Sequence, residues 1–204
     1  MIRKKEITRE KMLTIAYDLV VTQGFTNFTA RKVAQAIDCS TQPLYQEFGS
    51  MANLKHAILV KLQHYLIHEV YNQVVTGDRL LDIALDYIQF AEQNPKLYRA
   101  VFIEDHFGVN AMQNFTYRYG RQVMADYAPA QRLSKAAGEN VITGMWIIAQ
   151  GIASLVSAGF INISEKQTVN LLRAALYDFI HNDRLEDGMI TVNSFEKLDQ
   201  LTKI

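Results

Sequence analysis

The fold is decided by residues 29–48, which read TARKVAQAIDCSTQPLYQEF. Thr29 is placed to cap a helix over about residues 30–37, and Ser40 to cap a second helix over residues 41–48. Each segment repeats its apolar residues at helical spacing, so each presents one apolar face. Two helices of about two turns with a short turn between them have the length and spacing of a helix-turn-helix. Pairs of solvated short helices share this spacing, so the spacing alone leaves DNA binding and a purely structural pair both open.

Helical periodicity extends over the rest of the chain, and only 10 Gly and 3 Pro among 204 residues argue against an all-β fold. We expect further helices between Thr8 and Gly24, from Ser50 to about Val75, from Asp78 to Asn94, around residues 97–102, and over about 110–127, 134–159 and 165–181. The residues expected to point inward on the long fourth helix are Leu54, Ile58, Leu62, Tyr65 and Leu66. The sequence therefore predicts an all-α protein of about nine helices. Its N-terminal three-helix domain would occupy residues 1–50 and a larger helical domain residues 51–182, and we leave the tail, 183–204, unassigned.

The charges of the chain balance overall but not locally. The whole sequence has 21 basic and 21 acidic side chains, whereas residues 1–60 hold eight basic and five acidic ones. A basic N-terminal segment on an otherwise acidic chain indicates a local anion-binding module. One cysteine, Cys39, excludes a disulfide framework and favours a reducing compartment, and the charged start has no apolar segment typical of a signal peptide. We therefore expect a cytoplasmic protein.

The polar side chains of the helix pair suit DNA. A recognition helix must enter a major groove about 12 Å wide, where Gln can pair with adenine through two hydrogen bonds. Hydroxyl, Arg and Lys side chains at helix starts hold phosphates. The residues of these types are Thr29, Arg31 and Lys32 on the first helix and Thr41, Gln42, Tyr45 and Gln46 on the second.

Residues 24–34 and 40–50, GFTNFTARKVA and STQPLYQEFGS, resemble the DNA-binding domain of the tetracycline-repressor (TetR) family. The positions in register with the family pattern are Gly24, Phe25, Thr29, Val33, Ala34, Ser40, Leu44, Tyr45, Phe48, Ser50 and Leu54. The resemblance implies a homodimeric one-component regulator, a repressor that binds palindromic operator DNA and is released or altered by a small apolar or amphipathic effector. It adds Ser40 and Lys55 to the candidate DNA-binding residues. Thr41 to Tyr45 would then face bases, and Thr29, Arg31, Lys32, Tyr45 and Lys55 would face phosphates.

The chain departs from the family pattern at three positions near the expected DNA surface. Asp38 stands where the inter-helix turn usually has Gly, although Asp tolerates the left-handed conformation better than most residues. Glu47 replaces a usual His, and Met51 replaces a common phosphate-binding Lys, for which Lys55, one turn later, would substitute. These departures support an alternative from another class, a TetR-like protein–protein adaptor or coactivator with little DNA binding of its own.

Residues 141–164 contain no charged side chain. The segment is long enough to span a bilayer, but its polar residues and glycines favour a buried helix of a folded domain. Small residues along one side would let another helix approach closely, and together with the last helix they would form a four-helix dimer interface. The candidate interface residues are Gly144, Ile147, Gly151, Ser154, Ala158, Leu172, Leu176 and Phe179. Packing within one chain would produce the same pattern, so both interpretations stay open.

Residues 94–102, NPKLYRAVF, and the segment that follows Trp146 resemble the TetR subgroup named for a Trp-His-Gly motif, with Gln150 in place of the His. This resemblance implies a domain that dimerises and senses a ligand, without naming the ligand. The candidate pocket residues are Tyr98, Phe102, Phe107, Tyr117, Met124, Trp146 and Gln150. Aromatic residues at helical spacing also pack as ordinary core, which is the competing interpretation.

No enzyme motif emerges from the sequence. His64 and His68 have the one-turn spacing of a two-His metal site, but Tyr65 stands where the Glu of an H-E-x-x-H motif would be. An all-α enzyme with a buried site near these two histidines is the remaining rival. We expect no catalytic residues, no bound metal and no cofactor.

Overall fold

The computed structural model describes residues 7–108 and 110–182, and within them all regular structure is helical. The helices are α1 (Arg9–Gln23), α2 (Ala30–Ile37), α3 (Thr41–Phe48), α4 (Met51–Tyr65), α5 (Arg79–Gln93), α6 (Pro95–Tyr98), α7 (Ala111–Ala125), α8 (Lys135–Ser157) and α9 (Glu165–His181). Two π-helical turns, η1 (Leu66–Val70) and η2 (Arg99–Ile103), extend α4 and α6, and a 3₁₀ turn, η3 (Ala128–Ala130), precedes α8. The predicted all-α class is confirmed. The unassigned tail, 183–204, lies outside the described residues.

The helices begin where the sequence places their caps. Thr8 accepts a hydrogen bond from the backbone N–H of Lys11 at 3.3 Å, and α1 ends at Gly24, whose φ of 69° suits glycine. Ser164 and Gln167 cap the start of α9 reciprocally. Such caps satisfy the N–H groups that a helix end leaves without an intrahelical partner.

The fourth helix is shorter than the sequence predicts. We expected it to reach Val75, but α4 ends at Tyr65 and the π turn η1 ends at Val70. Tyr65, expected to point inward, is 38% exposed. The chain beyond η1 is held by α5, because the Asp82 carboxylate accepts the backbone N–H groups of Val75 (3.3 Å) and Thr76 (2.7 Å). A segment whose N–H groups bond across to another helix cannot also bond its own preceding turn.

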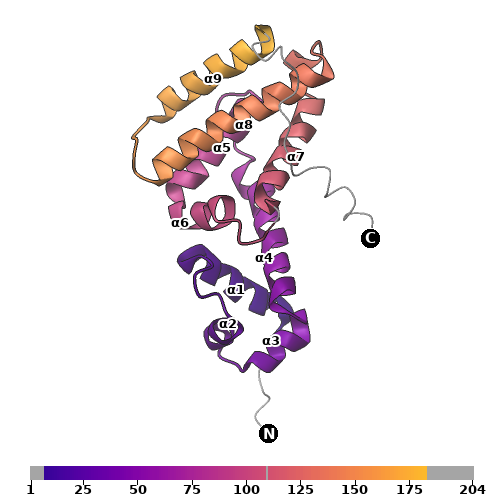
Figure 1. Cartoon of the computed structure of the whole chain (residues 1–204), viewed down its shortest axis with the longest axis vertical. Coiled ribbons are helices and arrows are strands. Elements are labelled where there is room, and N and C mark those ends of the chain that lie inside the picture. Colours follow the sequence, from indigo (N-terminus) through magenta and orange to yellow (C-terminus); the bar gives the residue numbers. More distant parts are fainter. Residues whose placement is uncertain (1–6, 109, 183–204) are drawn as a thin grey trace.

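Helix α5 is the centre of the larger helical part. Its side chains are buried almost all round, and it packs against α6, α7, α8 and α9. Figure 1 shows α8 and α9 crossing one end of the molecule, while α4 runs from α1–α3 at the other end up to this core. A helix that is apolar on nearly every side is stable only as such an internal element.

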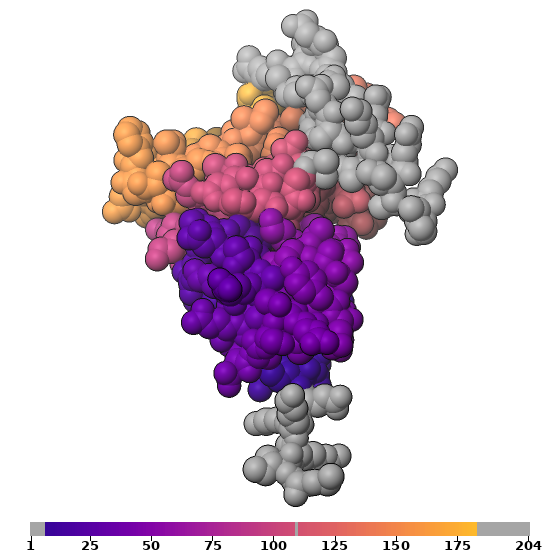
Figure 2. All heavy atoms as spheres, turned by 60° about the horizontal axis from the view of Figure 1, so that its bottom comes forward, coloured from indigo at the N-terminus to yellow at the C-terminus, as the bar shows by residue number. Residues whose placement is uncertain are grey.

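The three N-terminal helices rest on α6 through α1. Gly24 at the end of α1 approaches Ala100 of η2, since a Cβ atom built on Gly24 would lie 3.7 Å from the Ala100 Cβ atom. Figure 2, seen toward the N-terminal end, shows the indigo and purple helices against the pink segment that contains α6 and η2. Helices α1–α3, which we call the head, are therefore in direct contact with the core around α5.

Among the described residues, one helix, α8, is long and apolar enough to cross a membrane. Half of its most apolar window is buried inside the fold. Helix α8 packs against α5, α7 and α9, so the charge-free stretch serves as a core helix of this domain.

Candidate functional site

Helices α2 and α3 form the helix-turn-helix unit that the sequence predicts. The turn between them is made by Asp38, which adopts the left-handed conformation with φ 61° and ψ 49°. The backbone N–H of Cys39 closes the turn by donating to the Ala34 carbonyl at 3.0 Å. Leu44 and Phe48 of α3 are buried against the rest of the head. One face of α3 is therefore fixed by packing, and the other faces solvent.

The exposed face of α3 carries polar side chains. Gln42 and Gln46 are exposed, Tyr45 is 45% exposed, and Thr41 is half-buried. The Ser40 side chain, at the N-cap position, makes no capping hydrogen bond. Thr29 and Arg31 of the neighbouring helix are exposed, and Lys32 is half-buried, while the Thr29 hydroxyl accepts the Lys32 N–H at 3.3 Å. The structure thus leaves these side chains accessible around one short helix pair.

Lys55 does not join this group. Its ammonium lies 5.4 Å from the centre of the Phe25 ring, a cation–π contact, and the side chain is half-buried. Glu47 is exposed on α3 itself, and Met51 is half-buried at the start of α4. The expected substitution of Lys55 for the missing phosphate-binding Lys therefore requires its ammonium to leave the Phe25 ring.

Phe107, expected in a ligand pocket, lies instead where the head meets the core. Its ring packs edge-on against the Phe25 ring at 5.0 Å, and the His106 ring lies 5.1 Å from Phe25. The Nε2 atom of His106 is 2.7 Å from the Glu104 carboxylate, and Arg99 bonds the same carboxylate at 3.0 Å. Hydrogen bonds from His106 and Arg99 lower the pKa of Glu104. These contacts make an aromatic and charged junction between the two parts of the chain.

An apolar cavity of about 60 Å³ lies between α5, α7 and α8. Two of the predicted pocket residues, Tyr117 and Trp146, line it. The other lining residues are Leu80, Ile83, Ala84, Tyr87, Thr116, Gly120, Ile142, Met145 and Ala149. The Tyr117 hydroxyl donates to Glu139 at 2.5 Å, and burial raises the pKa of Tyr117. The volume is well below the roughly 300 Å³ of a typical ligand site, so a whole effector fits only if the walls move apart.

The remaining predicted pocket residues lie in the core rather than on the cavity wall. Tyr98 and Phe102 are buried and pack around Tyr87, with ring centres 5.8 Å and 5.0 Å from it. Gln150 accepts a hydrogen bond from the Tyr87 hydroxyl, and Met124 is buried outside the cavity lining. The sequence missed the small and aliphatic lining residues because nothing in their spacing distinguishes a cavity wall from a core.

The predicted interface residues divide into buried and exposed sets. Leu172 and Leu176 of α9 are buried inside the same chain and are therefore unavailable to a second subunit. Gly144 packs within the chain too, since an added Cβ atom would lie 2.6 Å from the half-buried Phe179 ring. The Ser154 hydroxyl lies 3.1 Å from the Tyr98 hydroxyl. These five residues mainly join α8 and α9 to their own core.

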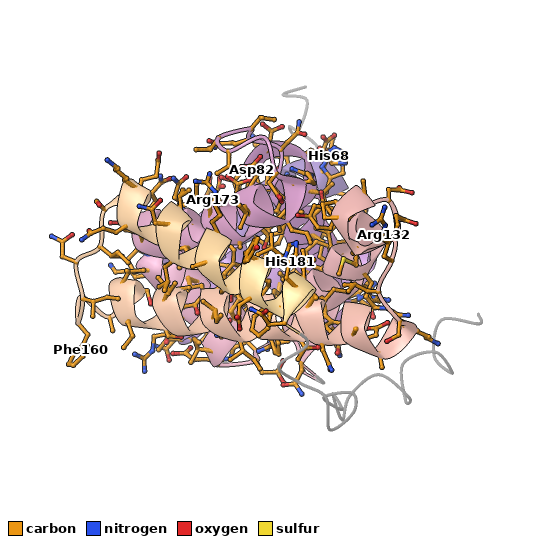
Figure 3. All side chains as sticks on the ribbon, turned by 90° about the horizontal axis from the view of Figure 1, so that it is seen from above. His68, Asp82, Arg132, Phe160, Arg173 and His181 are labelled. Carbon is orange, nitrogen blue, oxygen red and sulfur yellow. The ribbon has the colours of Figure 1, made fainter. Side chains whose placement is uncertain are left out.

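Ile147, Gly151 and Ala158 of α8 are exposed, as the interface expectation requires. The other exposed large apolar side chains of α8, α9 and their connection are Leu155, Phe160, Leu171 and Tyr177. Figure 3 shows α8 and α9 side by side across this end of the molecule, with Phe160 projecting from the segment that joins them. Large apolar side chains left in water on two packed helices are typical of a protein–protein interface.

In the described part of the chain, the two histidines have no third side chain placed to complete a metal site. The rings of His64 and His68 lie 4.1 Å apart. Across residues 7–108 and 110–182, no group of three or more His, Cys, Asp or Glu side chains is arranged to hold a metal ion. The geometry offers no support for metal binding at this pair.

Comparison with known proteins found similarity to a family model and to a solved structure. Residues 80–179 match a family model described as "Tetracyclin repressor-like, C-terminal domain". A crystal structure described as that of a TetR-like transcriptional regulator from Rhodococcus sp. RHA1 superposes with a TM-score of 0.55 at 18% sequence identity. The alignment covers 86% of this chain and 97% of that one, so the two share a fold over nearly their full lengths. No curated protein matches the chain.

Proposed function

We propose that this chain, which belongs to the tetracycline-repressor (TetR) family, is a homodimeric one-component repressor that acts in the cytoplasm. Members of the family are non-enzymatic transcription factors, and no catalytic role is assigned to any residue. The observation that carries the proposal is the α2–α3 pair, in which Leu44 and Phe48 are buried while Gln42, Tyr45 and Gln46 remain exposed. Its N-terminal domain, residues 1–50, would bind DNA, and residues 51–182 would dimerise and sense an effector.

The DNA contacts follow from exposure and chemistry. Gln42 and Gln46 have amides that can pair with adenine edges, with Thr41 at the start of the same helix. Arg31 and Lys32 supply charge for phosphates, joined by the hydroxyls of Thr29, Ser40 and Tyr45. Lys55 would take part only after leaving the Phe25 ring. Phosphate contacts fix the orientation of the head, and the base contacts select the sequence.

Two heads are needed for specific binding. A single short recognition helix reads only a few base pairs, whereas two heads about 34–36 Å apart read a palindrome across one helical turn. The exposed apolar side chains of α8 and α9, among them Ile147 and Leu155, are the surface that we assign to dimerisation.

Effector binding would act through α4. A ligand that enters between α5, α7 and α8 must enlarge the small cavity there, and α5 holds the segment after η1 through Asp82. Movement of that segment displaces α4, which leads directly into the head. The Phe25–Phe107 contact supplies a second connection. The effector can shift the head only by its difference in affinity for the two arrangements.

The test is a fluorescence-anisotropy titration of the full chain against the DNA upstream of its own gene, at about 50 and 200 mM salt. We expect specific binding that outcompetes random DNA and weakens as salt rises. Gln42→Ala should lower the preference for the specific site by about 1–3 kcal/mol, and Arg31→Ala should weaken all sequences alike and reduce the salt dependence. Gln122→Ala, on an exposed position of α7, is the matched control. Absence of binding at low salt would overturn the proposal.

The adaptor alternative rests on the charge of the exposed face of α3 and its surroundings. Glu47 is exposed on α3, and Lys55 is engaged with Phe25 rather than free beside the helix pair. A negative charge on α3 opposes the binding of DNA phosphates. The anisotropy titration separates the two functions, because an adaptor would show no salt-dependent DNA binding. It would still associate through the exposed apolar side chains of α8 and α9.

A further inference from the structure

A second, polar cavity of about 80 Å³ lies where the end of α4 and η1 meet α5. It is separate from the apolar cavity, since no residue lines both. Its walls carry the carboxylates of Glu69 and Asp86, the amides of Gln73 and Gln89 and the aromatic rings of Tyr65 and Phe90. Figure 3 labels Asp82 and His68, which belong to α5 and η1, two of the elements that line this cavity.

Asp86 is the unusual member of this set. Its side chain is buried, with the residue 1% exposed, yet neither carboxylate oxygen has a hydrogen-bond partner. Asp82, one turn earlier on α5 and equally buried, receives hydrogen bonds from the backbone N–H and the hydroxyl of Thr76 at 2.7 Å and 2.6 Å. Burial of an unpaired carboxylate is costly, so folded proteins normally pair such groups. Asp86 lacks that compensation and lines the polar cavity.

No lysine or arginine side chain lines the cavity to neutralise Asp86. Arg79, on the same helix, donates instead to the Tyr119 hydroxyl at 2.7 Å. Burial and the neighbouring Asp82 raise the pKa of Asp86 to about 6, and the charge of Arg79 partly opposes the shift. The carboxylate is therefore mostly ionised at neutral pH, and the cation that acts on it, Arg79, is bonded to Tyr119 rather than to Asp86.

We propose that this cavity binds the positively charged head of an organic amine, a primary ammonium or a guanidinium. Asp86 would accept its N–H groups, and the rings of Tyr65 and Phe90 would lie beside the cation, as cation–π sites require. The amide nitrogen of Gln89 donates to Glu165 at 3.0 Å, which leaves its carbonyl oxygen as an acceptor. At about 30 Å³ per water molecule, the cavity holds a head group only, so the rest of the ligand extends toward exposed Glu69.

An organic cation suits the site better than a metal ion. Only two carboxylates line the cavity, and the described residues contain no group of three metal-ligating side chains. Ca²⁺ takes six to eight oxygen ligands and Mg²⁺ demands near-ideal octahedral geometry, whereas an ammonium needs only a few acceptors and gains from aromatic walls.

The test is isothermal titration of the full chain with n-butylammonium at about pH 7.5, with n-butanol as the uncharged probe and MgCl₂ and CaCl₂ as the metal probes. Asp86→Asn removes the unpaired charge and keeps the shape of the side chain. Glu92→Gln, an exposed acid of α5 that does not line the cavity, is the matched control. We expect n-butylammonium to bind the wild type and Glu92→Gln equally, and Asp86→Asn at least about tenfold more weakly. Butanol should not bind.

Equal affinity of n-butylammonium for the wild type and Asp86→Asn, or no binding at all, would overturn the proposal. Binding of Mg²⁺ or Ca²⁺ that depends on Asp86, without binding of the ammonium, would replace it with a metal site. Circular dichroism of Asp86→Asn checks that the variant is folded, and we expect it to fold because it loses an unpaired buried charge. The titration uses no DNA, so its failure and a failure of DNA binding are independent results.

Discussion

At the scale of single residues, two glycines of α8 have opposite surroundings. A Cβ atom added to Gly144 would lie 2.6 Å from the Phe179 ring, whereas nothing lies within 4 Å of one added to Gly138. We expect Gly138→Ala to raise the free energy of unfolding by up to about 1 kcal/mol through helix propensity. Gly144→Ala should lower it by about 1–2 kcal/mol, because the ring must shift and the crowding outweighs that gain. Urea denaturation at equal protomer concentration measures both, and stabilisation by Gly144→Ala would show that Phe179 moves freely.

Asp86 makes stability depend on pH. Its pKa is raised from 3.8 to about 6, so the folded protein binds the proton more tightly than the unfolded chain does. Ionisation of Asp86 therefore destabilises the fold, fully above about pH 6 and not at all below about pH 4. We expect Asp86→Asn to be more stable than the wild type by on the order of 2 kcal/mol at pH 8, with the difference shrinking as the pH falls toward 4. Urea unfolding across this range tests the prediction, and a pH-independent difference would contradict it.

At the scale of elements, the segment between η1 and α5 depends on one carboxylate. Asp82 accepts the N–H groups of Val75 and Thr76 and the Thr76 hydroxyl. We expect Asp82→Ala to accelerate hydrogen exchange at both amides and to lower the free energy of unfolding by about 1–3 kcal/mol, because two partly buried N–H groups and the Thr76 hydroxyl lose their acceptor. Asp126→Ala, an exposed acid after α7, is the control and should leave both amides unchanged. Unchanged exchange in Asp82→Ala would mean that the segment is held by other contacts.

The helices and their caps were predictable from sequence, because a cap and an apolar period are local signals. Thr8, Thr29 and the Ser164–Gln167 pair lie where expected. The end of α4 was not predictable, because no local signal marks the π turn and because the bonds that hold Val75 and Thr76 come from Asp82 on the next helix. Periodicity separated core from surface on α4 except at Tyr65, which is partly exposed.

The sequence predicted which kinds of site to expect, but it identified only some of the residues that form them. The helix-turn-helix residues are local in sequence, and all but Lys55 remain accessible around α2 and α3. A cavity is defined by which helices meet, so the sequence identified Tyr117 and Trp146 and missed the walls supplied by α5. Asp86 carries no sequence signal at all, since an acid in an amphipathic helix is usually solvated and its isolation arises only from the fold.

At the scale of the whole molecule, the head and the core are connected at three places. Helix α4 runs out of the head into the core and ends against the segment that α5 holds (Figure 1). Helix α1 packs against α6, and Phe25 packs against Phe107. A rearrangement around α5 therefore reaches the head through one covalent connection and two packed contacts. This arrangement suits a two-state regulator, because packed interfaces switch between discrete arrangements rather than deform continuously.

In the proposed function, two molecules associate through the exposed apolar surface of α8. Ile147 is 53% and Leu155 is 41% exposed, and they lie on the same side of the helix as Gly151. A charge at the centre of an apolar interface must be buried without a partner, so we expect Ile147→Glu and Leu155→Glu each to weaken dimerisation at least about tenfold. Val74→Glu, at a more exposed apolar position before α5, should have no effect. Sedimentation velocity over a range of protein concentrations measures the association. If both α8 variants remained as dimeric as the wild type, the exposed apolar side chains of α8 would serve another partner.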